Sequence, residues 1–156
     1  MPCWAPNGFG DGGGAVSESA AIAKMFTAPS PACVAALDAC GSFFGGVAKF
    51  LKNTEAGAAE DAARANLEEQ LGKLEAVLGN AGPFLAGATP GLADCSIATK
   101  LYILFVAGQH FKGFILGAEY PSVARYWTAI SAHPAFYKTR YPEAEMLHGW
   151  GQARGG

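Results

Sequence analysis

The side chains able to do chemistry here include four cysteines, three histidines and a short Ser-Glu-Ser motif near the amino terminus. A thiol becomes a good nucleophile when a helix N-terminus or a nearby cation lowers its pKa. The cysteines (Cys3, Cys33, Cys40 and Cys95) form no Cys-x-x-Cys pair and no zinc-ligand spacing. Cys33 and Cys40 are seven residues apart, too far along one helix for an unstrained disulfide. We therefore expect buried free thiols, with Cys95 as inert packing in an apolar helix.

The motif Ser17-Glu18-Ser19 opens a predicted short helix, which two following prolines end. A helix N-terminus offers unpaired N–H groups and the positive end of the helix dipole to a carboxylate. Ser19 adds a hydroxyl group, and Glu18 can meet an ammonium group of the same ligand. An ordinary helix start is the alternative interpretation of these three residues.

Two histidines and a tryptophan are further candidates. His110 lies near the end of a predicted apolar helix, where it either faces a cleft or caps the helix. His133 precedes a proline at a helix break, so we expect it on the surface. Trp150, close to the carboxyl end, either closes over a ligand site or packs on a helical core.

The composition fits one compact domain and excludes several classes of function. Of the 156 residues, 51% are hydrophobic and 15% are charged, with a net charge of −2. Nucleic acid is not an expected partner, because its binding needs clustered Lys and Arg. We also expect no membrane span, since the most apolar stretch, residues 102–108, is far too short. The amino terminus has no basic region or hydrophobic signal core, so secretion is not expected.

The hydrophobic pattern predicts helices. Apolar residues at spacings of three and four predict one helix from residue 31 to about residue 53 and another over residues 62–79, with residues 57–60 as a loop. The apolar positions of the first helix are Val34, Leu37, Cys40, Phe44, Val47 and Leu51, and those of the second are Leu67, Leu71, Leu74 and Leu78.

The second half of the sequence is helical as well. Residues 92–111 are apolar on nearly every side, which predicts a buried central helix. Another helix should begin at Pro121 and continue to Ile130, followed by a helical turn to Tyr137 and a last segment over residues 143–150. No strand-like alternation follows residue 16, so the predicted fold class is mainly all-α.

One stretch resembles a known family. Residues 82–87 (Gly-Pro-Phe-Leu-Ala-Gly), followed by Leu92-Ala93-Asp94-Cys95-Ser96, resemble the glutathione transferase superfamily, whose central helix opens with a hydroxyl residue, two spacers and an aspartate. Asp94 takes the place of that aspartate, which acts as a structural cap on the helix N-terminus. Gly91 replaces the hydroxyl residue, so half of the capping box is missing, at a cost of only a few tenths of a kcal/mol.

Within that superfamily, three motifs resemble the dehydroascorbate reductases: Lys100-Leu101-Tyr102, Gln109-His110-Phe111-Lys112-Gly113 and Gly149-Trp150. The resemblance runs from about residue 15 onward. It implies a C-terminal helical bundle over residues 29–156 and the remnant of a thioredoxin-like α/β domain over residues 1–28. At position 103, where these reductases have a histidine near the ascorbate pocket, this chain has Ile103.

The same resemblance implies site residues. Glu18 and Ser19 would hold the γ-glutamyl end of glutathione, and Met1, before Pro2, would pair its main chain with the cysteinyl unit. Because Met1-Pro2 matches a Val-Pro with a cis proline, this pairing falls at a terminus, a poor place for ordered contacts. The implied substrate-pocket residues are Trp150, Lys100 and His110.

The implied reaction is reduction of dehydroascorbate to ascorbate by glutathione. A thiolate at a helix N-terminus attacks dehydroascorbate, ascorbate leaves, and two glutathiones form and then resolve a mixed disulfide. That cysteine belongs to a segment that would precede residue 1, and Cys3 follows the matched proline without a helix start beside it. We therefore expect no catalytic residue in this chain and no reductase activity from the chain alone.

The implied co-substrate is glutathione, with no metal, and the implied partners are glutathione and dehydroascorbate or ascorbate. A full-length protein of this kind is expected to be monomeric and to reside in the cytoplasm or plastid stroma. Two alternatives remain open. One is a conjugating glutathione transferase, with Ser or Tyr in place of the cysteine, and the other is a non-enzymatic helical module that docks on other proteins.

Overall fold

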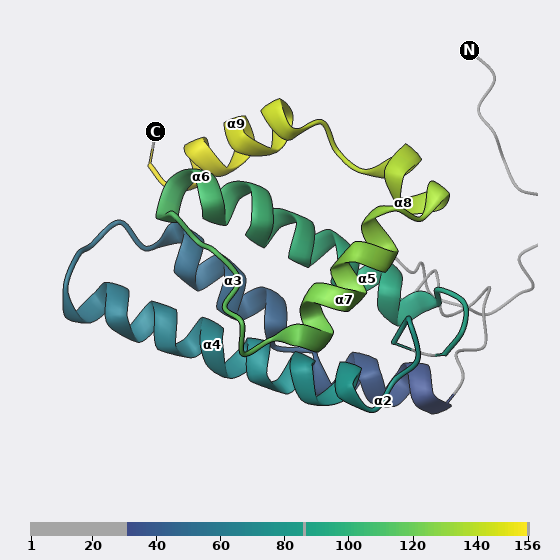
Figure 1. Ribbon diagram of the computed structural model, residues 1–156. Coiled ribbons are helices and arrows are strands. Elements are labelled where there is room, and N and C mark those ends of the chain that lie inside the picture. Colours follow the sequence, from purple (N-terminus) through teal and green to yellow (C-terminus); the bar gives the residue numbers. More distant parts are fainter. Residues whose placement is uncertain (1–30, 86, 156) are drawn as a thin grey trace, which may run out of the picture.

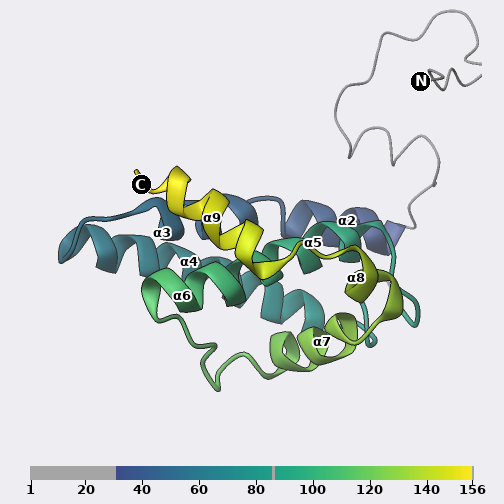
Figure 2. The same ribbon diagram turned by 90° about the horizontal axis from the view of Figure 1, so that it is seen from above.

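The computed structural model describes residues 31–85 and 87–155 (Figures 1 and 2). The predicted helix after Ser17 and the candidates Met1, Glu18 and Ser19 lie outside these residues. Within them the regular elements are helices, and the only β-type pairing is an isolated bridge between Phe84 and Gly87. The helices are α2 (Pro31–Ala39), α3 (Phe43–Lys52), α4 (Ala58–Gly79), α5 (Leu92–Ile103), η1 (Leu104–Gly108), α6 (Gln109–Lys112), α7 (Pro121–Ser131), α8 (Pro134–Thr139) and α9 (Glu143–Ala153).

The helical rod formed by α5, η1 and α6 runs through the middle of the molecule, between α9, α7 and the pair α3 and α4 (Figure 1). Its inner residues are fully buried: Ala93, Ile97, Ala98, Leu101, Leu104 and Ala107. This confirms the central buried helix expected over residues 92–111. The π-helical turn η1 was not predicted, because the apolar pattern continues through it without a change.

The start of α5 depends on Asp94, whose side chain is completely buried. Its carboxylate accepts hydrogen bonds from the backbone N–H of Leu85, at 2.9 Å, and of Gly91, at 2.8 Å. Since Gly91 has no side chain, only the carboxylate half of a capping box exists, as the sequence predicts. The adjacent Ala93 N–H donates to the Cys33 Sγ of α2, at 3.3 Å.

Helix α4 presents its predicted leucine stripe to the core. The four leucines at positions 67, 71, 74 and 78 are at most 1% exposed. The helix begins at Ala58, earlier than predicted, so the expected loop over residues 57–60 is wrong beyond Gly57. Gly57 precedes the helix with a φ of 69°, a left-handed conformation that suits glycine.

The single helix expected from residue 31 to about residue 53 is also wrong. A turn at residues 40–42 divides it into α2 and α3, and this break changes the buried face. Val34 and Phe44 are 41% and 40% exposed, whereas the core takes up Cys33 and Phe43. Cys40, Val47 and Leu51 are buried as predicted, so the continuous 3.6-residue period failed at Val34 and Phe44 and held at these three positions.

By length and composition alone, the segment Pro31–Lys52 is apolar enough to cross a membrane. The expectation that no segment reaches this length was therefore too strict. In the fold, the segment is interrupted by the turn between α2 and α3, and one third of its most apolar window is buried inside the molecule. A core helix also meets these criteria, so the finding is weak evidence for a span.

Cations from distant helices cap the carboxyl end of α3. Lys112 Nζ donates to the Asn53 carbonyl oxygen, at 2.9 Å, and forms an ion pair with the Glu60 carboxylate. The Arg154 guanidinium, just after α9, donates to the Leu51 carbonyl oxygen. Positive charge is favourable at a helix C-terminus, so these contacts fasten α6 and α9 to the end of α3.

A carboxylate from α4 caps the amino end of α7. Glu75 accepts hydrogen bonds from the backbone N–H groups of Ser122 and Val123, both at 2.9 Å. Burial raises the pKa of Glu75, but these bonds, the Ser122 side chain and the charge of Arg125 together outweigh it and lower the pKa. The carboxylate form therefore links α4 to α7.

Replacing Gly46 with alanine should lower the free energy of unfolding by about 1–3 kcal/mol, because it overpacks the contact between α3 and α4. A Cβ atom there would lie 2.8 Å from Gln70 Cγ, and the buried Gln70 is held by a 2.6 Å hydrogen bond from Ser42. Gly45→Ala is the matched control, because no atom lies within 4 Å of a Cβ at that position. Its higher helix propensity alone should raise the free energy of unfolding by about 0.5–1 kcal/mol. Urea denaturation measures both, and equal stability of the two variants would contradict this packing.

Asp94→Ala should cost about 2–4 kcal/mol, because two buried N–H groups lose a charged acceptor. The free energy of unfolding of Asp94→Asn should lie between those of Asp94→Ala and the original protein, since the amide oxygen replaces only one of the two carboxylate acceptors. Asp38→Ala, at an exposed position, is the control and should change stability by less than about 0.5 kcal/mol. Chemical denaturation followed by circular dichroism gives the values, and similar losses for the Asp94 and Asp38 variants would disprove the capping role.

Glu75→Gln should flatten the dependence of stability on pH in acid. Because the folded pKa of Glu75 is lowered, its carboxylate stabilises the fold above the ordinary value of 4.5, and this contribution is lost as pH falls through the folded pKa. The free energy of unfolding of the original protein should therefore fall more steeply from about pH 6 to pH 3. Glu68→Gln, at an exposed position of α4, is the control. Identical slopes for the original protein and Glu75→Gln would contradict the assignment.

Candidate functional site

The candidate site is built around Trp150 on α9. Residues Met146, Trp150 and Ala153 follow the helical spacing and share the face of α9 that turns toward α3 and α5. The indole ring of Trp150 meets the ring of Phe44 edge-on, with centroids 6.5 Å apart. Trp150 is therefore partly buried against α3, and its remaining surface borders a groove.

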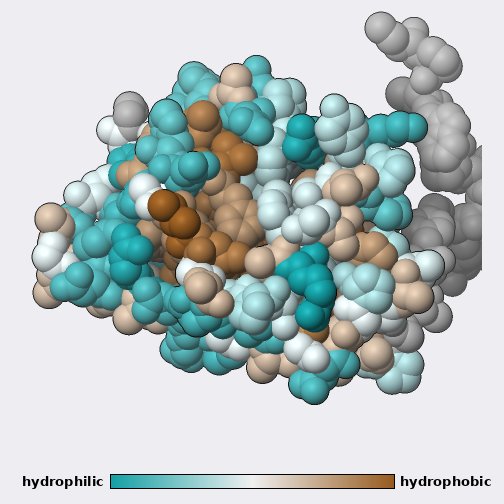
Figure 3. Space-filling view, in the orientation of Figure 1, coloured by the Kyte–Doolittle hydropathy of each residue, from teal (hydrophilic) through white to brown (hydrophobic). Residues whose placement is uncertain are grey.

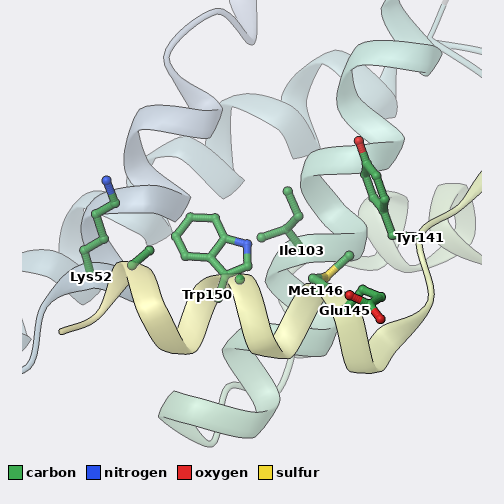
Figure 4. Close-up of a pocket in the computed structure, with 8 residues that line it drawn as sticks. Lys52, Ile103, Tyr141, Glu145, Met146 and Trp150 are labelled. Carbon is green, nitrogen blue, oxygen red and sulfur yellow. The ribbon is translucent and has the colours of Figure 1, made fainter. Parts of the chain in front are cut away.

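This groove has a volume of about 410 Å³ and lies between α3, α5 and α9 (Figure 4). Its walls are mainly apolar, with the Lys52 ammonium at one end and the Tyr141 hydroxyl and Glu145 carboxylate at the other. We call it the Trp150 groove. The residues labelled in Figure 4 are Lys52, Ile103, Tyr141, Glu145, Met146 and Trp150.

A groove of this kind can hold a small molecule with a polar edge. Volumes of a few hundred Å³, apolar walls and a few polar groups are typical of small-molecule sites. Ile103 forms part of the wall, at the position where the sequence resemblance implies a histidine. The groove itself therefore offers binding and orientation, and the described part of its lining holds no thiol.

The predicted substrate-pocket residues lie in different places. Trp150 lines the groove. Lys100 instead donates to the Ser96 hydroxyl, at 2.8 Å, and burial lowers the pKa of Lys100, opposed by the nearby Cys40 thiol. His110 lines another cleft, on the far side of α9 from the groove. The structure therefore does not bring these three side chains into one cavity.

The cysteines of the described residues are poor nucleophiles. Cys33 and Cys40 are buried, whereas Cys95 is exposed, so the expectation that Cys95 is buried packing is wrong. Burial raises the pKa of the Cys40 thiol, although Lys100 partly offsets it. Burial and the negative charge of Asp94 raise the pKa of Cys95. Both Cys40 and Cys95 are therefore thiols rather than thiolates near neutral pH.

His133 has a local structural role. It precedes α8, and its Nδ1 accepts a hydrogen bond from the Ala135 N–H, at 3.3 Å. Its ring also meets Phe84 edge-on, with centroids 6.1 Å apart. This side chain therefore caps α8.

Sequence reasoning missed several residues of the groove. Lys52, Tyr141 and Met146 come from two helices and a linker, and no local motif connects them. The spacing of Met146 and Trp150 on α9 was the one available signal, because residues four apart share a helix face. That spacing identifies the side of α9 that faces α3, but it does not identify the residues on the other wall of the groove.

The comparisons with known proteins agree with this architecture. Residues 57–129 match the family described as glutathione S-transferase, C-terminal domain. The chain is 35% identical over 101 residues to a probable cytosolic glutathione S-transferase, DHAR1, of Oryza sativa subsp. japonica, covering 65% of this chain and 46% of that protein. It is 33% identical over 108 residues to glutathione S-transferase DHAR2 of Arabidopsis thaliana, covering 69% and 49%.

A solved structure matches as well. The crystal structure of Chlamydomonas reinhardtii dehydroascorbate reductase aligns with a TM-score of 0.66 and 30% identity, over 73% of this chain and 54% of that chain. The chain thus spans about half the length of the relatives that it matches. Together, the helical fold, the Asp94 cap and these similarities show that the chain belongs to the glutathione transferase superfamily, through a C-terminal helical domain like those of the dehydroascorbate reductases.

Proposed function

We propose that this chain supplies the substrate-binding helical domain of a glutathione-dependent dehydroascorbate reductase. The observation that carries the proposal is the similarity in sequence and fold to proteins named as dehydroascorbate reductases or DHAR-type glutathione transferases. In this proposal, Trp150 packs against bound dehydroascorbate, and the Lys52 ammonium lies beside its oxygen atoms.

The nucleophile must come from another part of the reductase. None of the cysteines in the described residues is both exposed and in thiolate form near neutral pH: Cys33 and Cys40 are buried, and Cys95 has a raised pKa. We propose that residues 1–28 are the end of a thioredoxin-like domain, with Glu18, Ser19 and Met1 binding glutathione. Lys100 and His110 remain predicted substrate-pocket residues for which the groove geometry offers no support.

The names of the relatives bear on the compartment. They include a cytosolic protein and chloroplastic proteins of Oryza sativa subsp. japonica and Arabidopsis thaliana. We accordingly place the proposed reductase in the cytoplasm or the plastid stroma. Glutathione is its co-substrate in this proposal, in keeping with the family to which the domain belongs.

The interaction-module alternative has one observation in its favour. Val34 and Phe44 expose about 40% of their surface, and Phe44 packs beside Trp150 at the edge of the groove. An exposed apolar side chain such as Phe44, next to an apolar groove, is part of a surface that a second domain or protein can cover. A reductase also needs such a surface for its thiol domain, so the reaction itself must distinguish the two functions.

A chimera tests the proposed function. The N-terminal half of the Oryza DHAR1 protein is joined to residues 29–156, and glutathione-dependent loss of dehydroascorbate is measured. We expect activity from the chimera and none above the uncatalysed rate from the 156-residue chain. Trp150→Ala in the chimera should lower kcat/KM for dehydroascorbate about tenfold, because a wall of the groove is lost.

Tyr137→Ala is the control for that variant, because Tyr137 is 61% exposed and lies outside the groove. The KM for glutathione should change little in either variant. A folded chimera that conjugates glutathione to an aryl chloride but does not reduce dehydroascorbate would favour the conjugating transferase. A folded chimera with neither activity would favour the interaction module.

A further inference from the structure

A second cleft lies on the other side of α9 from the Trp150 groove, between α9, α7 and the central rod. Its volume is about 390 Å³. Hydrophobic surface gathers below α9 on this face of the molecule (Figure 3). We call it the Trp127 cleft, and the lining residues that matter here are Tyr102, Phe105, His110, Trp127, Arg140 and Glu143.

The floor of the Trp127 cleft is aromatic. The rings of Tyr102 and Trp127 are stacked, with centroids 6.3 Å apart and an interplanar angle of 18°. Phe105 approaches Trp127 to 4.9 Å between centroids. Tyr102 is only 3% exposed, so it supports Trp127, and the partly exposed rings of Trp127 and Phe105, tilted by 59°, form the platform on which another ring can pack.

The π-helical turn η1 contributes to this platform. Phe105 and Val106 lie in η1, and both line the cleft. Isolated π-turns are uncommon, and they occur often at functional sites because they shift side chains relative to a regular α-helix. The turn packs closely on its far side: a Cβ atom at Gly108 would lie 3.2 Å from Leu104 and 3.3 Å from Phe114.

Arg140 provides a fixed positive charge at the rim. Its guanidinium lies 5.7 Å from the ring centre of Tyr102 and 4.9 Å from that of Tyr137. Within the described part of the chain, no carboxylate approaches it within 4.0 Å. Contact with two rings restrains the planar guanidinium group of Arg140. The group is therefore well suited to bind a carboxylate through two parallel hydrogen bonds.

The other polar groups of the cleft limit the choice of ligand. Glu143 also lines the cleft. Burial raises the pKa of Tyr102, the negative charge of Glu143 raises it further, and the positive charge of Arg140 lowers it. Glu143 therefore opposes an anion to some degree. The Tyr102 hydroxyl donates to the Tyr141 carbonyl oxygen, at 2.9 Å, so it holds the linker before α9. His110 and Gln109 also line the cleft.

We propose that the Trp127 cleft binds a small aromatic carboxylate, with its ring on Trp127 and Phe105 and its carboxylate on Arg140. The cleft is separate from the Trp150 groove, and the proposal does not depend on the reductase function. The ring supplies apolar contact, and the charge selects for a carboxylate over a neutral compound of the same shape.

The test uses 2-naphthoate as the probe and the 156-residue chain, with binding followed by calorimetric titration. We expect saturable binding at one site and at least tenfold weaker binding of the neutral analogue 2-naphthalenemethanol. Arg140→Gln should raise the Kd for 2-naphthoate at least tenfold, because a charged hydrogen-bonding partner is lost. Glu143→Gln should lower the Kd severalfold, because it removes the opposing charge.

Arg64→Gln is the matched control, since Arg64 also lies over an aromatic ring, that of Phe50, but does not line the cleft. It should leave the Kd unchanged, and thermal melts should show that each variant is folded. The proposal is overturned by an absence of saturable binding, by equal affinity for the neutral analogue, or by an unchanged Kd in Arg140→Gln. It also fails if Trp150→Leu, in the other groove, weakens binding more than Arg140→Gln does.

Discussion

The buried carboxylate of Asp94 is the interaction on which the arrangement of the other helices depends. A buried charge is costly unless hydrogen bonds satisfy it, and here the backbone N–H groups of Leu85 and Gly91 do so. These bonds fix the loop before α5 and the direction in which the central rod leaves it. Burial, reinforced by the nearby charge of Asp94, also raises the pKa of Tyr126 on α7. Asp94 therefore couples the loop to the central helix.

The parts of the fold that follow from local patterns could be predicted from the sequence. The leucine stripe of α4, the apolar rod and the Asp94 cap each depend on residues close together in the chain. The division of residues 31–52 was missed because three turn residues change the phase of the helix without changing its composition. Val34 and Phe44 were therefore expected inside and lie partly outside. Cys95 was misplaced for a related reason, since its helix is buried on most sides but not on all.

The candidate site was predictable only in part, because its walls come from distant segments. Trp150 could be selected as a large aromatic residue near the carboxyl end, and it lines the groove. Lys100 and His110 were grouped with it by motif, but ten residues of helix rotate their side chains to different faces. The π-turn between them adds a further displacement. The opposing wall from Lys52 could not be inferred without knowing how α3 and α9 pack.

Helix α9 is the wall that the two cavities share. Met146 and Trp150 face the groove, whereas Glu143 and Leu147 face the cleft, so each pair occupies one side of the helix at a spacing of four. Polar contacts hold both ends of this segment. Arg154 binds the Leu51 carbonyl at the end of α3, and the Tyr102 hydroxyl binds the Tyr141 carbonyl just before α9.

Because these contacts fasten α9 at both ends, the shapes of the two cavities depend on each other. A rigid helix fastened at both ends moves as a unit, so a shift of α9 toward the central rod would narrow both cavities, and a rotation about its axis would change their shapes in opposite directions. The Tyr102 side chain links the linker to the Trp127 cleft, since its hydroxyl holds the linker while its buried ring stacks on Trp127. The position of α9 therefore helps to set the shape of both cavities.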